Sequence, residues 1–279
     1  MAPSDSAADA RVAVYFDVEN LVVSQYDRVH GKGAWRSDNP LGKSPGDQVR
    51  ERLTSSQINS SAILDYAASI GVVSIIRAYA NWSALPYAPL GSVLARRSVD
   101  LVQLFPLSGT KNGSDIRLAT DVLDDLQRYP HLTHVLIAAG DSDYVPVAQK
   151  CRRLDKRVVG VGVEGSTSVA WEAACDEFRR YGALVGEDDR MPEAAPEEPV
   201  EESPADLLKR ALRLEHRRTG DDWVHLSVLK SLILRLNPGF DERELGHKSF
   251  SAFVRAHPEI ARLDAKASGS ARLVELGPV

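Results

Sequence analysis

The sequence has few of the features that mark several classes of protein. Its 279 residues include two cysteines, Cys151 and Cys175, too few for a disulfide framework or a four-cysteine zinc site. The longest apolar runs, such as 135–139 and 158–163, are far too short to cross a bilayer. Residues 1–10 have neither a basic start nor an apolar stretch, so no secretory signal peptide is predicted. These absences predict a cytoplasmic protein without a membrane segment.

The formal net charge of −5 at first argues against a nucleic-acid partner. Most of it lies in residues 186–205, which hold eight acidic residues, one basic residue and four prolines. Such a stretch buries too little apolar surface to fold and is typical of a flexible linker. Residues 1–185 carry 20 basic and 21 acidic residues, and residues 206–279 carry 13 and 10. We therefore predict a disordered N-terminus (1–10), a large domain (11–185), an acidic linker (186–204) and a mildly basic small domain (205–279).

The large domain alternates apolar runs with amphipathic patterns. Strands are predicted at 11–16, 72–79, 100–105, 134–139 and 157–163, and helices at 55–68, 114–127, 144–154 and 168–175. Strands that are apolar along their whole length are typical of a parallel sheet covered by helices on both faces. Residues 27–46, rich in Gly, Pro, Asn and Ser, predict an insertion or a mobile loop. Ligands of such sheets bind at the carboxyl ends of the strands.

Acidic residues stand at three separate boundaries between predicted strands and helices. They are Asp17 in YFDVEN, Asp115 and Asp121 in KNGSDIRLATD, and Asp141 and Asp143 in IAAGDSDY. In a parallel sheet these boundaries converge on one edge, where neighbouring carboxylates repel one another unless a cation neutralises them. Oxygen ligands of this kind suit Mg²⁺ or Mn²⁺ rather than zinc. The pattern therefore predicts a divalent-metal site.

Each of these residues also has an ordinary interpretation. An aspartate after a strand is often a helix N-cap, and Asn20 fits the same role. Asp121 does not share a helical face with Asp115, and Asp124 and Asp125 read as charges on the helix surface. Glu19 is expected to point away from Asp17. The argument for a metal site therefore rests on the set of boundaries rather than on one residue.

These motifs, together with RAYANWS and the following helix and VVGVG strand, resemble the NYN domain over about residues 10–182. This is a PIN-like nuclease fold found in LabA-like bacterial proteins and limkain-type ribonucleases. The resemblance implies an α/β fold with a parallel sheet and a Mg²⁺- or Mn²⁺-dependent endoribonuclease. It also implies products with a 5′-phosphate and a 3′-hydroxyl.

The resemblance also assigns roles to residues. It implies that Asp17, Asp115 and Asp141 hold the metal, with Asp143 and Asn20 supporting the metal, its waters or the substrate, and with Asp121 at a frequently acidic position. One departure is Asn81 in RAYANWS, where relatives often carry an acid. Because Asn81 adds no charge, an alternative stays open: a catalytically slow RNA-binding regulator, or a protein-interaction module that keeps the NYN fold.

Cations beside these motifs are candidates for contacts with RNA phosphates. Lys111 and Arg117 flank Asp115 and are predicted to bind the backbone. A later basic group comprises Arg152, Arg153, Lys156 and Arg157. It reads either as an RNA track or as a helix end that complements the macrodipole. A metal-dependent phosphatase is a weaker reading, because Asp17 is followed by Val-Glu rather than by an x-Asp pair.

The small domain combines helical patterns with a terminal hairpin. Helices are predicted from 205, at 226–236 and at 249–256, and strands at 260–264 and 271–276, which is a small winged-helix pattern. The segments WVHLSVLKSLI, the Pro-Gly-Phe loop and LGHKSFSAFV resemble the OST-HTH/LOTUS domain over about residues 204–277. The resemblance implies binding of RNA, in some members structured or G-rich RNA, or else a protein partner or a homodimer. Candidate RNA contacts are Lys230, Arg235, His247 and Lys248.

Overall fold

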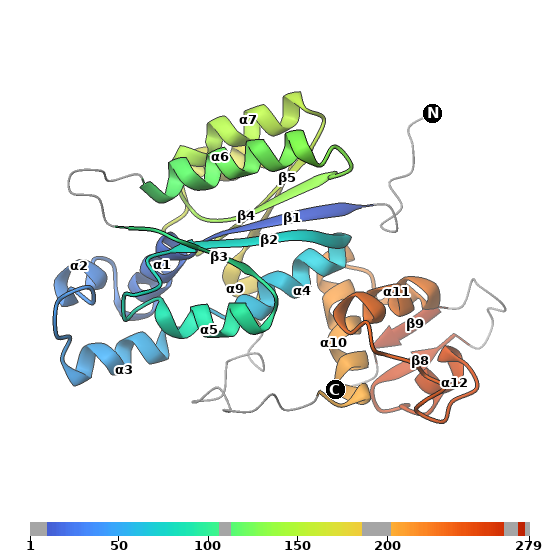
Figure 1. The fold of residues 1–279 in the computed structure, drawn as a ribbon. Helices are drawn as coiled ribbons and strands as arrows, with labels where there is room; N and C mark the ends of the chain where they lie inside the picture. The colour runs from blue at the N-terminus through green and yellow to red at the C-terminus, as the bar shows by residue number, and fades with distance from the viewer. Residues whose placement is uncertain (1–9, 106–112, 186–201, 265–272, 277–279) are drawn as a thin grey trace. The chain divides into compact units, whose positions relative to one another are not determined.

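The computed structural model describes residues 10–105, 113–185, 202–264 and 273–276 (Figure 1). The predicted disordered N-terminus, most of the predicted linker, Lys111 and the start of the predicted strand at 271–276 lie outside these ranges. The chain divides into two compact units, which are described separately. The first contains the large sheet, and the second contains the C-terminal elements from α10 onward.

The first unit is built on a six-stranded sheet in the order β3-β2-β1-β4-β5-β6. The strands are β1 (Arg11–Asp17), β2 (Val72–Ala80), β3 (Asp100–Gln103), β4 (His134–Ala138), β5 (Arg157–Gly162) and β6 (Glu177–Arg180). The sheet is parallel, with Val12 opposite His134 where β1 pairs with β4. The strand order reverses between β1 and β4, and ligands bind at such a switch point in open α/β sheets. The predicted PIN-like α/β fold is confirmed, whereas β6 was not predicted.

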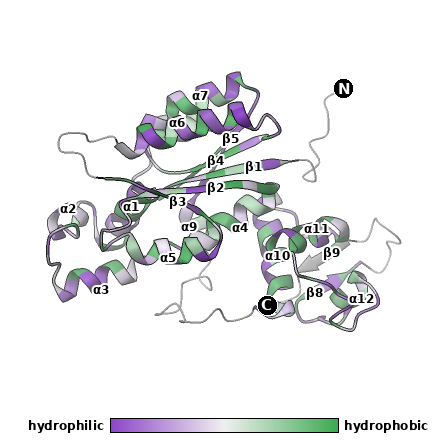
Figure 2. Ribbon diagram, in the orientation of Figure 1, coloured by the Kyte–Doolittle hydropathy of each residue, from purple (hydrophilic) through white to green (hydrophobic). Residues whose placement is uncertain are grey.

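Helices cover both faces of this sheet. They are α1 (Val18–His30), α2 (Ala34–Asp38), α3 (Asp47–Ser55), α4 (Ser60–Ile70), α5 (Ala88–Arg96), α6 (Gly113–Arg128), the 3₁₀ helix η1 (Ser142–Tyr144), α7 (Val145–Arg153), α8 (Val169–Ala174) and α9 (Tyr181–Leu184). Figure 1 shows α6 and α7 over one face and α4, α5 and α9 against the other. All of β4 and all of β1 after Arg11 are buried, as expected for central strands. Figure 2 shows both hydrophilic and hydrophobic residues along α6 and α7, as expected for helices that pack on one side.

The segment 27–46 contains the end of α1, the short helix α2 and hydrogen-bonded turns, so its prediction as an insertion or mobile loop missed these helical parts. The Asp27 carboxylate accepts hydrogen bonds from the backbone N–H groups of Gly33 at 2.9 Å and Trp35 at 2.8 Å, which fixes the turn into α2. Gly31 and Gly33 adopt φ values of 104° and 85°, which favour glycine. The composition signalled the turn correctly, but local hydrogen bonds order it.

The second unit is a small helical domain with a three-stranded antiparallel sheet. Its elements are α10 (Pro204–Thr219), β7 (Trp223–His225), α11 (Leu226–Leu236), α12 (Phe250–Arg255), β8 (Ala261–Leu263) and β9 (Leu273–Leu276), with sheet order β7-β9-β8. The hydroxyl of Ser203 caps α10 by accepting from the Asp206 N–H, and Gly220 ends the helix in the left-handed region. Leu208, Leu229 and Phe253 lie in its buried core. These elements agree with the predicted winged-helix pattern, to which β7 is an addition.

Across the described ranges, the helices are all too short or too polar to traverse a bilayer.

Candidate metal centre

Asp17 is a buried carboxylate at the carboxyl end of the central strand. It is the last residue of β1 and caps α1, accepting at Oδ1 from the Asn20 N–H at 3.1 Å. Its exposed fraction is 1%, and burial raises the pKa of Asp17 to about 7, although hydrogen bonds from Tyr144 and the Asn20 N–H oppose the shift. Within the described residues, neither lysine nor arginine forms an ion pair with it. The hydrogen bond from the Asn20 N–H confirms the N-cap interpretation of Asp17. It leaves Oδ2 and the negative charge of Asp17 to be compensated by other groups.

The Tyr144 hydroxyl lies between Asp17 and Asp115. It is 2.7 Å from Asp17 Oδ2 and 3.0 Å from Asp115 Oδ1, and the ring is fully buried. Burial and the two carboxylates raise the pKa of Tyr144, so the side chain remains a phenol. A phenol has one hydrogen and donates to one carboxylate at a time. Two carboxylates therefore share a single donor, which leaves negative charge that a proton or a cation must balance.

Two further carboxylates, Asp141 and Asp143, converge on Asp115 beside Tyr144. Oxygens of Asp115, Asp141 and Asp143 all lie within 4.8 Å of one another. Asp115 is in the first turn of α6, and burial followed by the charge of Asp141 raises its pKa. Asp141 follows β4 and caps η1, accepting from the Asp143 N–H at 3.1 Å. The convergence of strand and helix boundaries expected from the sequence is therefore present, at the switch point between β1 and β4.

The side chain of Asn20 links the first turn of α1 to the turn after β4. Its Oδ1 accepts from the Gly140 N–H at 2.9 Å, so this oxygen is already engaged with the turn after β4. Gly140 approaches its neighbours closely, because a Cβ there would lie 3.2 Å from Thr167 Cα and 3.5 Å from Asn20 Oδ1. Asn20 therefore positions the turn that carries Asp141. Its predicted role in supporting the metal, its waters or the substrate stays a prediction.

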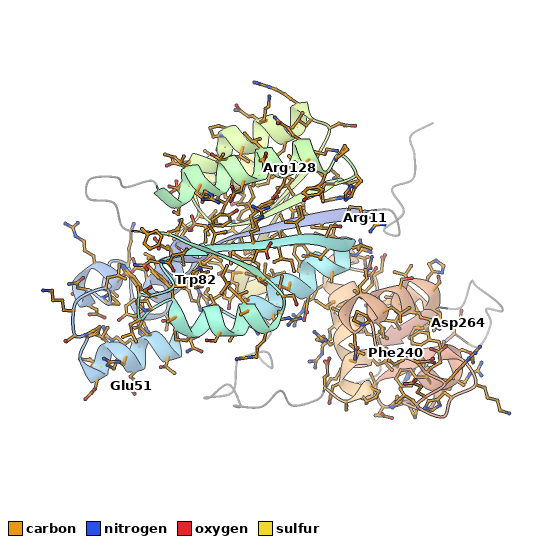
Figure 3. All side chains as sticks on the ribbon, viewed as in Figure 1. Arg11, Glu51, Trp82, Arg128, Phe240 and Asp264 are labelled. Atoms are coloured by element: carbon orange, nitrogen blue, oxygen red, sulfur yellow. The ribbon has the colours of Figure 1, made fainter. Side chains whose placement is uncertain are left out.

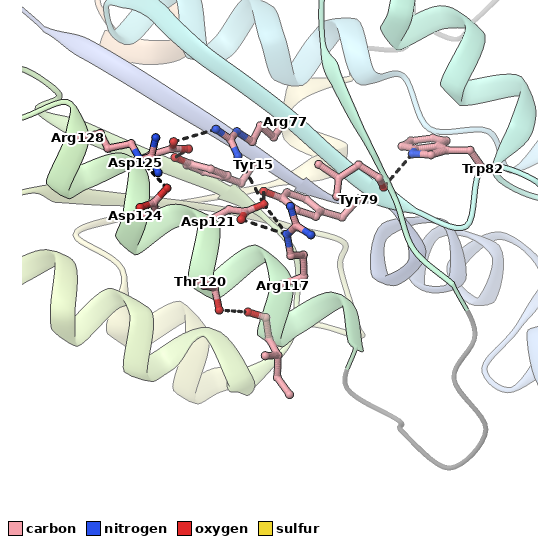
Figure 4. A network of polar contacts seen from close by, with 12 residues as sticks. Tyr15, Arg77, Tyr79, Trp82, Arg117, Thr120, Asp121, Asp124, Asp125 and Arg128 are labelled. Carbon is pink, nitrogen blue, oxygen red and sulfur yellow. Dashed lines mark hydrogen bonds and ion pairs between the residues drawn. The ribbon is translucent and has the colours of Figure 1, made fainter.

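Asp121 belongs to a different group of residues, shown in Figure 4. Its carboxylate accepts from the Tyr79 hydroxyl at 3.0 Å and from Arg117 Nε at 3.0 and 3.1 Å, and lies 3.5 Å from Arg77. The structure does not bring Asp121 to the acidic cluster, because six residues along a helix turn the side chain away from Asp115. Arg117, predicted to bind RNA, is paired with Asp121 on the same helix.

Asp125 lies one helical turn beyond Asp121 and is buried, with an exposed fraction of 1%. It accepts from the Tyr15 hydroxyl and from Arg77, both at 2.9 Å (Figure 4). The prediction that it is a surface charge was wrong, because Arg77 on β2 compensates its charge inside the protein. Asp124 is exposed, as predicted, and it pairs with Arg128.

Asn81 and Glu19 hold the end of β2 near this edge. The Asn81 N–H donates to Glu19 Oε1 at 2.8 Å, and Asn81 Oδ1 accepts from Gln103 at 3.0 Å and from the Ser83 N–H at 3.3 Å. Asn81 therefore links β2 to β3 through its side chain. That Glu19 points away from Asp17 stays a prediction; its carboxylate accepts from Asn81, and its charge contributes to the raised pKa of Asp17. The expectation assumed an extended segment, whereas α1 begins at Val18.

The predicted RNA contacts of the second unit have different environments. Lys230 pairs with Glu242 at 2.7 Å and lies 5.9 Å from the Phe250 ring centroid, so its charge is largely compensated. The His247 ring packs edge-on against Phe253, at 5.4 Å between ring centroids. Lys248 is exposed. Arg235 is partly buried, and this burial lowers its pKa.

The sequence analysis missed Tyr144 as a functional residue. Its position in the GDSDY motif was the available signal, because η1 turns the chain there and directs the ring back toward β1.

The later basic group of the large domain lies away from the acidic cluster: Arg157 begins β5, and Arg152 and Lys156 donate to the carbonyls of Ala174 and Pro130. These residues belong to the amino edge of the sheet.

Comparisons with known proteins agree with both resemblances. The NYN domain model matches residues 11–182, and the OST-HTH/LOTUS domain model matches residues 201–271. A search of curated proteins found no match. The crystal structure of a Vibrio parahaemolyticus protein of unknown function aligns with 20% identity and a TM-score of 0.41, covering 63% of this chain and 95% of that chain.

Proposed function

The chain belongs to the NYN domain family, and from this we propose that it is a metal-dependent endoribonuclease that hydrolyses RNA phosphodiester bonds. The family supplies the nuclease-like fold. The observation that carries the proposal is the buried Asp17, which shares the Tyr144 hydroxyl with Asp115 beside Asp141 and Asp143. This arrangement concentrates negative charge at the switch point of the sheet, where the fold binds its ligands.

The donor set suits a hard divalent cation. All the groups offered are carboxylate oxygens, and Mg²⁺ and Mn²⁺ prefer such ligands. A cation would also balance the charge of Asp17, whose pKa is raised by burial and which has no ion pair with a lysine or arginine of the described residues. In this proposal Asp17, Asp115 and Asp141 hold the ion and Asp143 completes the set.

A divalent ion bound here would neutralise charge on a scissile phosphate and lower the pKa of a nearby water. The protein's own residues contribute position. Tyr144 holds Asp17 and Asp115 toward each other, and Asn20 fixes the turn that carries Asp141. Asp143 is the exposed member of the cluster, so in this proposal it is the carboxylate most accessible to water and substrate.

The second domain suggests how RNA is retained. OST-HTH/LOTUS domains imply RNA binding, and Lys248 with His247 lies just before α12 in this unit. Tethering an RNA-binding module to a catalytic domain raises the local concentration of substrate at the catalytic site. On the catalytic domain, Lys111 and Arg117 are proposed to bind the RNA backbone.

The competing function is an RNA-binding regulator that cleaves slowly or not at all. Asn81 favours it, because a neutral side chain stands where relatives often carry an acid, and its oxygen is engaged with Gln103 and the Ser83 N–H. The two functions differ in one observable, which is turnover of RNA in the presence of a divalent ion.

The test is cleavage of end-labelled single-stranded and hairpin RNA by the full chain with Mn²⁺ or Mg²⁺. We expect cleavage by the wild type and none by the double variant Asp17→Asn/Asp141→Asn. The matched control is Asp100→Asn/Asp124→Asn, which removes two exposed carboxylates outside the cluster and should cleave normally. Equal absence of cleavage in all three proteins, with RNA binding retained, would favour the regulator.

A further inference from the structure

Residues 31–46, between α1 and α3, carry exposed positive charge without a counterpart. We call this segment the cationic lobe; it contains α2 and the side chains of Lys32, Arg36 and Lys43, all exposed. Within the described ranges, none of the three forms an ion pair with a carboxylate. The one acid of the lobe, Asp38, is already paired with Arg52 at 2.7 Å. The lobe therefore presents three uncompensated cations to solvent.

The lobe is held in a defined position by side-chain contacts. The Tyr26 hydroxyl donates to Asp38 at 2.5 Å, and the Asp27 carboxylate binds the backbone of Gly33 and Trp35. The Trp35 ring packs edge-on against Tyr26 at 5.5 Å and stacks on Tyr87 at 6.3 Å. The charges of Lys32 and Arg36 are thus carried on an ordered element rather than on a free loop.

The same aromatic contacts place the lobe beside the acidic cluster. Tyr87 is buried and stands at the start of α5, in the segment that follows the carboxyl end of β2 and is bonded to Glu19 through the Asn81 N–H. Trp35 stacks on this tyrosine and precedes Arg36. Figure 3 shows Arg11 at one end of β1 and Glu51, on α3, beyond the opposite end of the sheet. The lobe therefore lies at the carboxyl edge, with the site.

We propose that the cationic lobe binds the phosphate backbone of RNA next to the acidic cluster through Lys32, Arg36 and Lys43. This inference rests on the proposed function for the identity of its ligand. A cluster of carboxylates repels a polyanion along the approach to the site, and only the ion offsets this locally. Exposed cations on a neighbouring ordered element supply the attraction by neutralising phosphates and releasing their counterions. The lobe thereby binds a part of the RNA that lies outside the metal centre.

The basic residues at the other edge of the sheet provide a matched control. Arg11 begins β1, Arg153 ends α7 and Arg157 begins β5, and all three are exposed. Within the described ranges, none of their guanidinium groups is paired with a carboxylate. Substituting these three removes the same charge as substituting the lobe, but far from the acidic cluster. Any effect of net charge alone will therefore appear in both triple variants.

The experiment measures the salt dependence of RNA affinity in the full chain carrying Asp17→Asn, in EDTA, so that the RNA stays intact. A fluorescent single-stranded 30-mer is titrated at several salt concentrations. For Lys32→Ala/Arg36→Ala/Lys43→Ala we expect the slope of log K against log salt to become shallower by about 2, at about 0.7 per lost contact with single strands. Affinity at 0.1 M salt should fall roughly tenfold or more. A second triple variant carries Arg36→Lys in place of Arg36→Ala. Because lysine keeps the charge at this position, this variant should regain part of the lost slope.

Equal slopes for wild type and the lobe variant, or an equal change in the Arg11/Arg153/Arg157→Ala control, would overturn the proposal. An acidic protein as the true partner of the lobe would also leave the slope unchanged. Because all substituted residues are exposed, unfolding temperatures should match, and circular dichroism checks this. The result is independent of turnover: absence of cleavage by wild type refutes the proposed nuclease, whereas an unchanged slope refutes only the role of the lobe.

Discussion

The Tyr144 hydroxyl lies 2.7 Å from Asp17 Oδ2, and this contact joins the two strands at which the order of the sheet reverses. Asp17 ends β1, and Tyr144 belongs to the turn after β4. The same hydroxyl is 3.0 Å from Asp115 on α6. One phenol, in the turn after β4, therefore sets the mutual position of two carboxylates from β1 and α6.

Replacing Tyr144 with phenylalanine should weaken metal binding. The substitution removes the only described side-chain hydroxyl that reaches both Asp17 and Asp115, so their orientation is less fixed. Loss of such an outer contact lowers metal affinity or activity about 10- to 100-fold. The Mn²⁺ concentration for half-maximal cleavage, or the Mn²⁺ affinity from calorimetry, should rise accordingly.

The control is Tyr15→Phe, which deletes another buried hydroxyl–carboxylate hydrogen bond, to Asp125 at 2.9 Å. Both variants should lose about 1–3 kcal/mol of unfolding free energy. Only Tyr144→Phe should change the Mn²⁺ dependence. The same Mn²⁺ affinity in both variants would show that Tyr144 acts on stability alone.

Stability in EDTA should depend on pH through Asp17. Its pKa is raised to about 7 in the folded protein from an unfolded value near 3.8, so the folded state binds the proton more tightly. The unfolding free energy should therefore fall as pH rises from about 4 to about 7, and level off above it. Asp17→Asn removes this dependence. The difference in unfolding free energy between wild type and Asp17→Asn, measured by urea unfolding, should change by a few kcal/mol between pH 4 and pH 7, since each pKa unit is about 1.4 kcal/mol.

Asp124→Asn, at an exposed position, should follow the wild-type pH profile. A parallel profile for Asp17→Asn as well would mean that Asp17 is ionised in the folded protein across the whole range.

Asp115 and Asp121, six residues apart on α6, should give different phenotypes. Asp115→Asn removes a member of the acidic cluster and should raise the Mn²⁺ requirement, because fewer charged ligands remain. Asp121→Asn instead weakens the contacts with Arg77, Tyr79 and Arg117, at a cost of about 1–3 kcal/mol in unfolding free energy. Mn²⁺ titrations and urea unfolding of both variants separate the two effects. A raised Mn²⁺ requirement in Asp121→Asn would instead indicate that Asp121 is a metal ligand.

Two lysines of the C-terminal unit should also differ. Lys248 is exposed, so Lys248→Ala should reduce RNA affinity and its salt dependence while leaving unfolding unchanged. Lys230 is paired with Glu242, so Lys230→Ala should mainly reduce stability. Fluorescence binding of RNA and thermal unfolding of the full chain measure both quantities. RNA affinity that is insensitive to Lys248→Ala at low salt would argue against a role in RNA binding.

The parts of the fold that the sequence predicts are those with strong local signals. The apolar runs of β1 and β4 favour buried strands, and aspartates at or just after their ends lie at the carboxyl edge of the sheet wherever the other elements go. Asp17 and Asp141 were therefore accessible from the sequence. The order β3-β2-β1-β4-β5-β6 then brings their strands together.

The parts that escaped prediction depend on partners distant in the sequence. Burial of Asp125 requires Arg77, 48 residues away, and the role of Tyr144 requires Asp17, 127 residues away. A glycine-rich composition marks the turn before α2, but the capping by Asp27 that orders it is a matter of local geometry. Periodicity alone reports neither kind of contact.

The central claim is that the carboxylates at the ends of β1 and β4 hold a divalent ion that promotes hydrolysis of RNA. The most direct measurement is the single-turnover rate of RNA cleavage with Mn²⁺, with analysis of the product ends, for wild type and Asp17→Asn/Asp141→Asn. The account predicts metal-dependent cleavage by wild type, leaving 5′-phosphate and 3′-hydroxyl ends. It also predicts a loss of about a thousandfold in the variant, equivalent to roughly 4 kcal/mol of transition-state stabilisation. Equal rates for the two proteins, or cleavage that persists unchanged in EDTA, would contradict it.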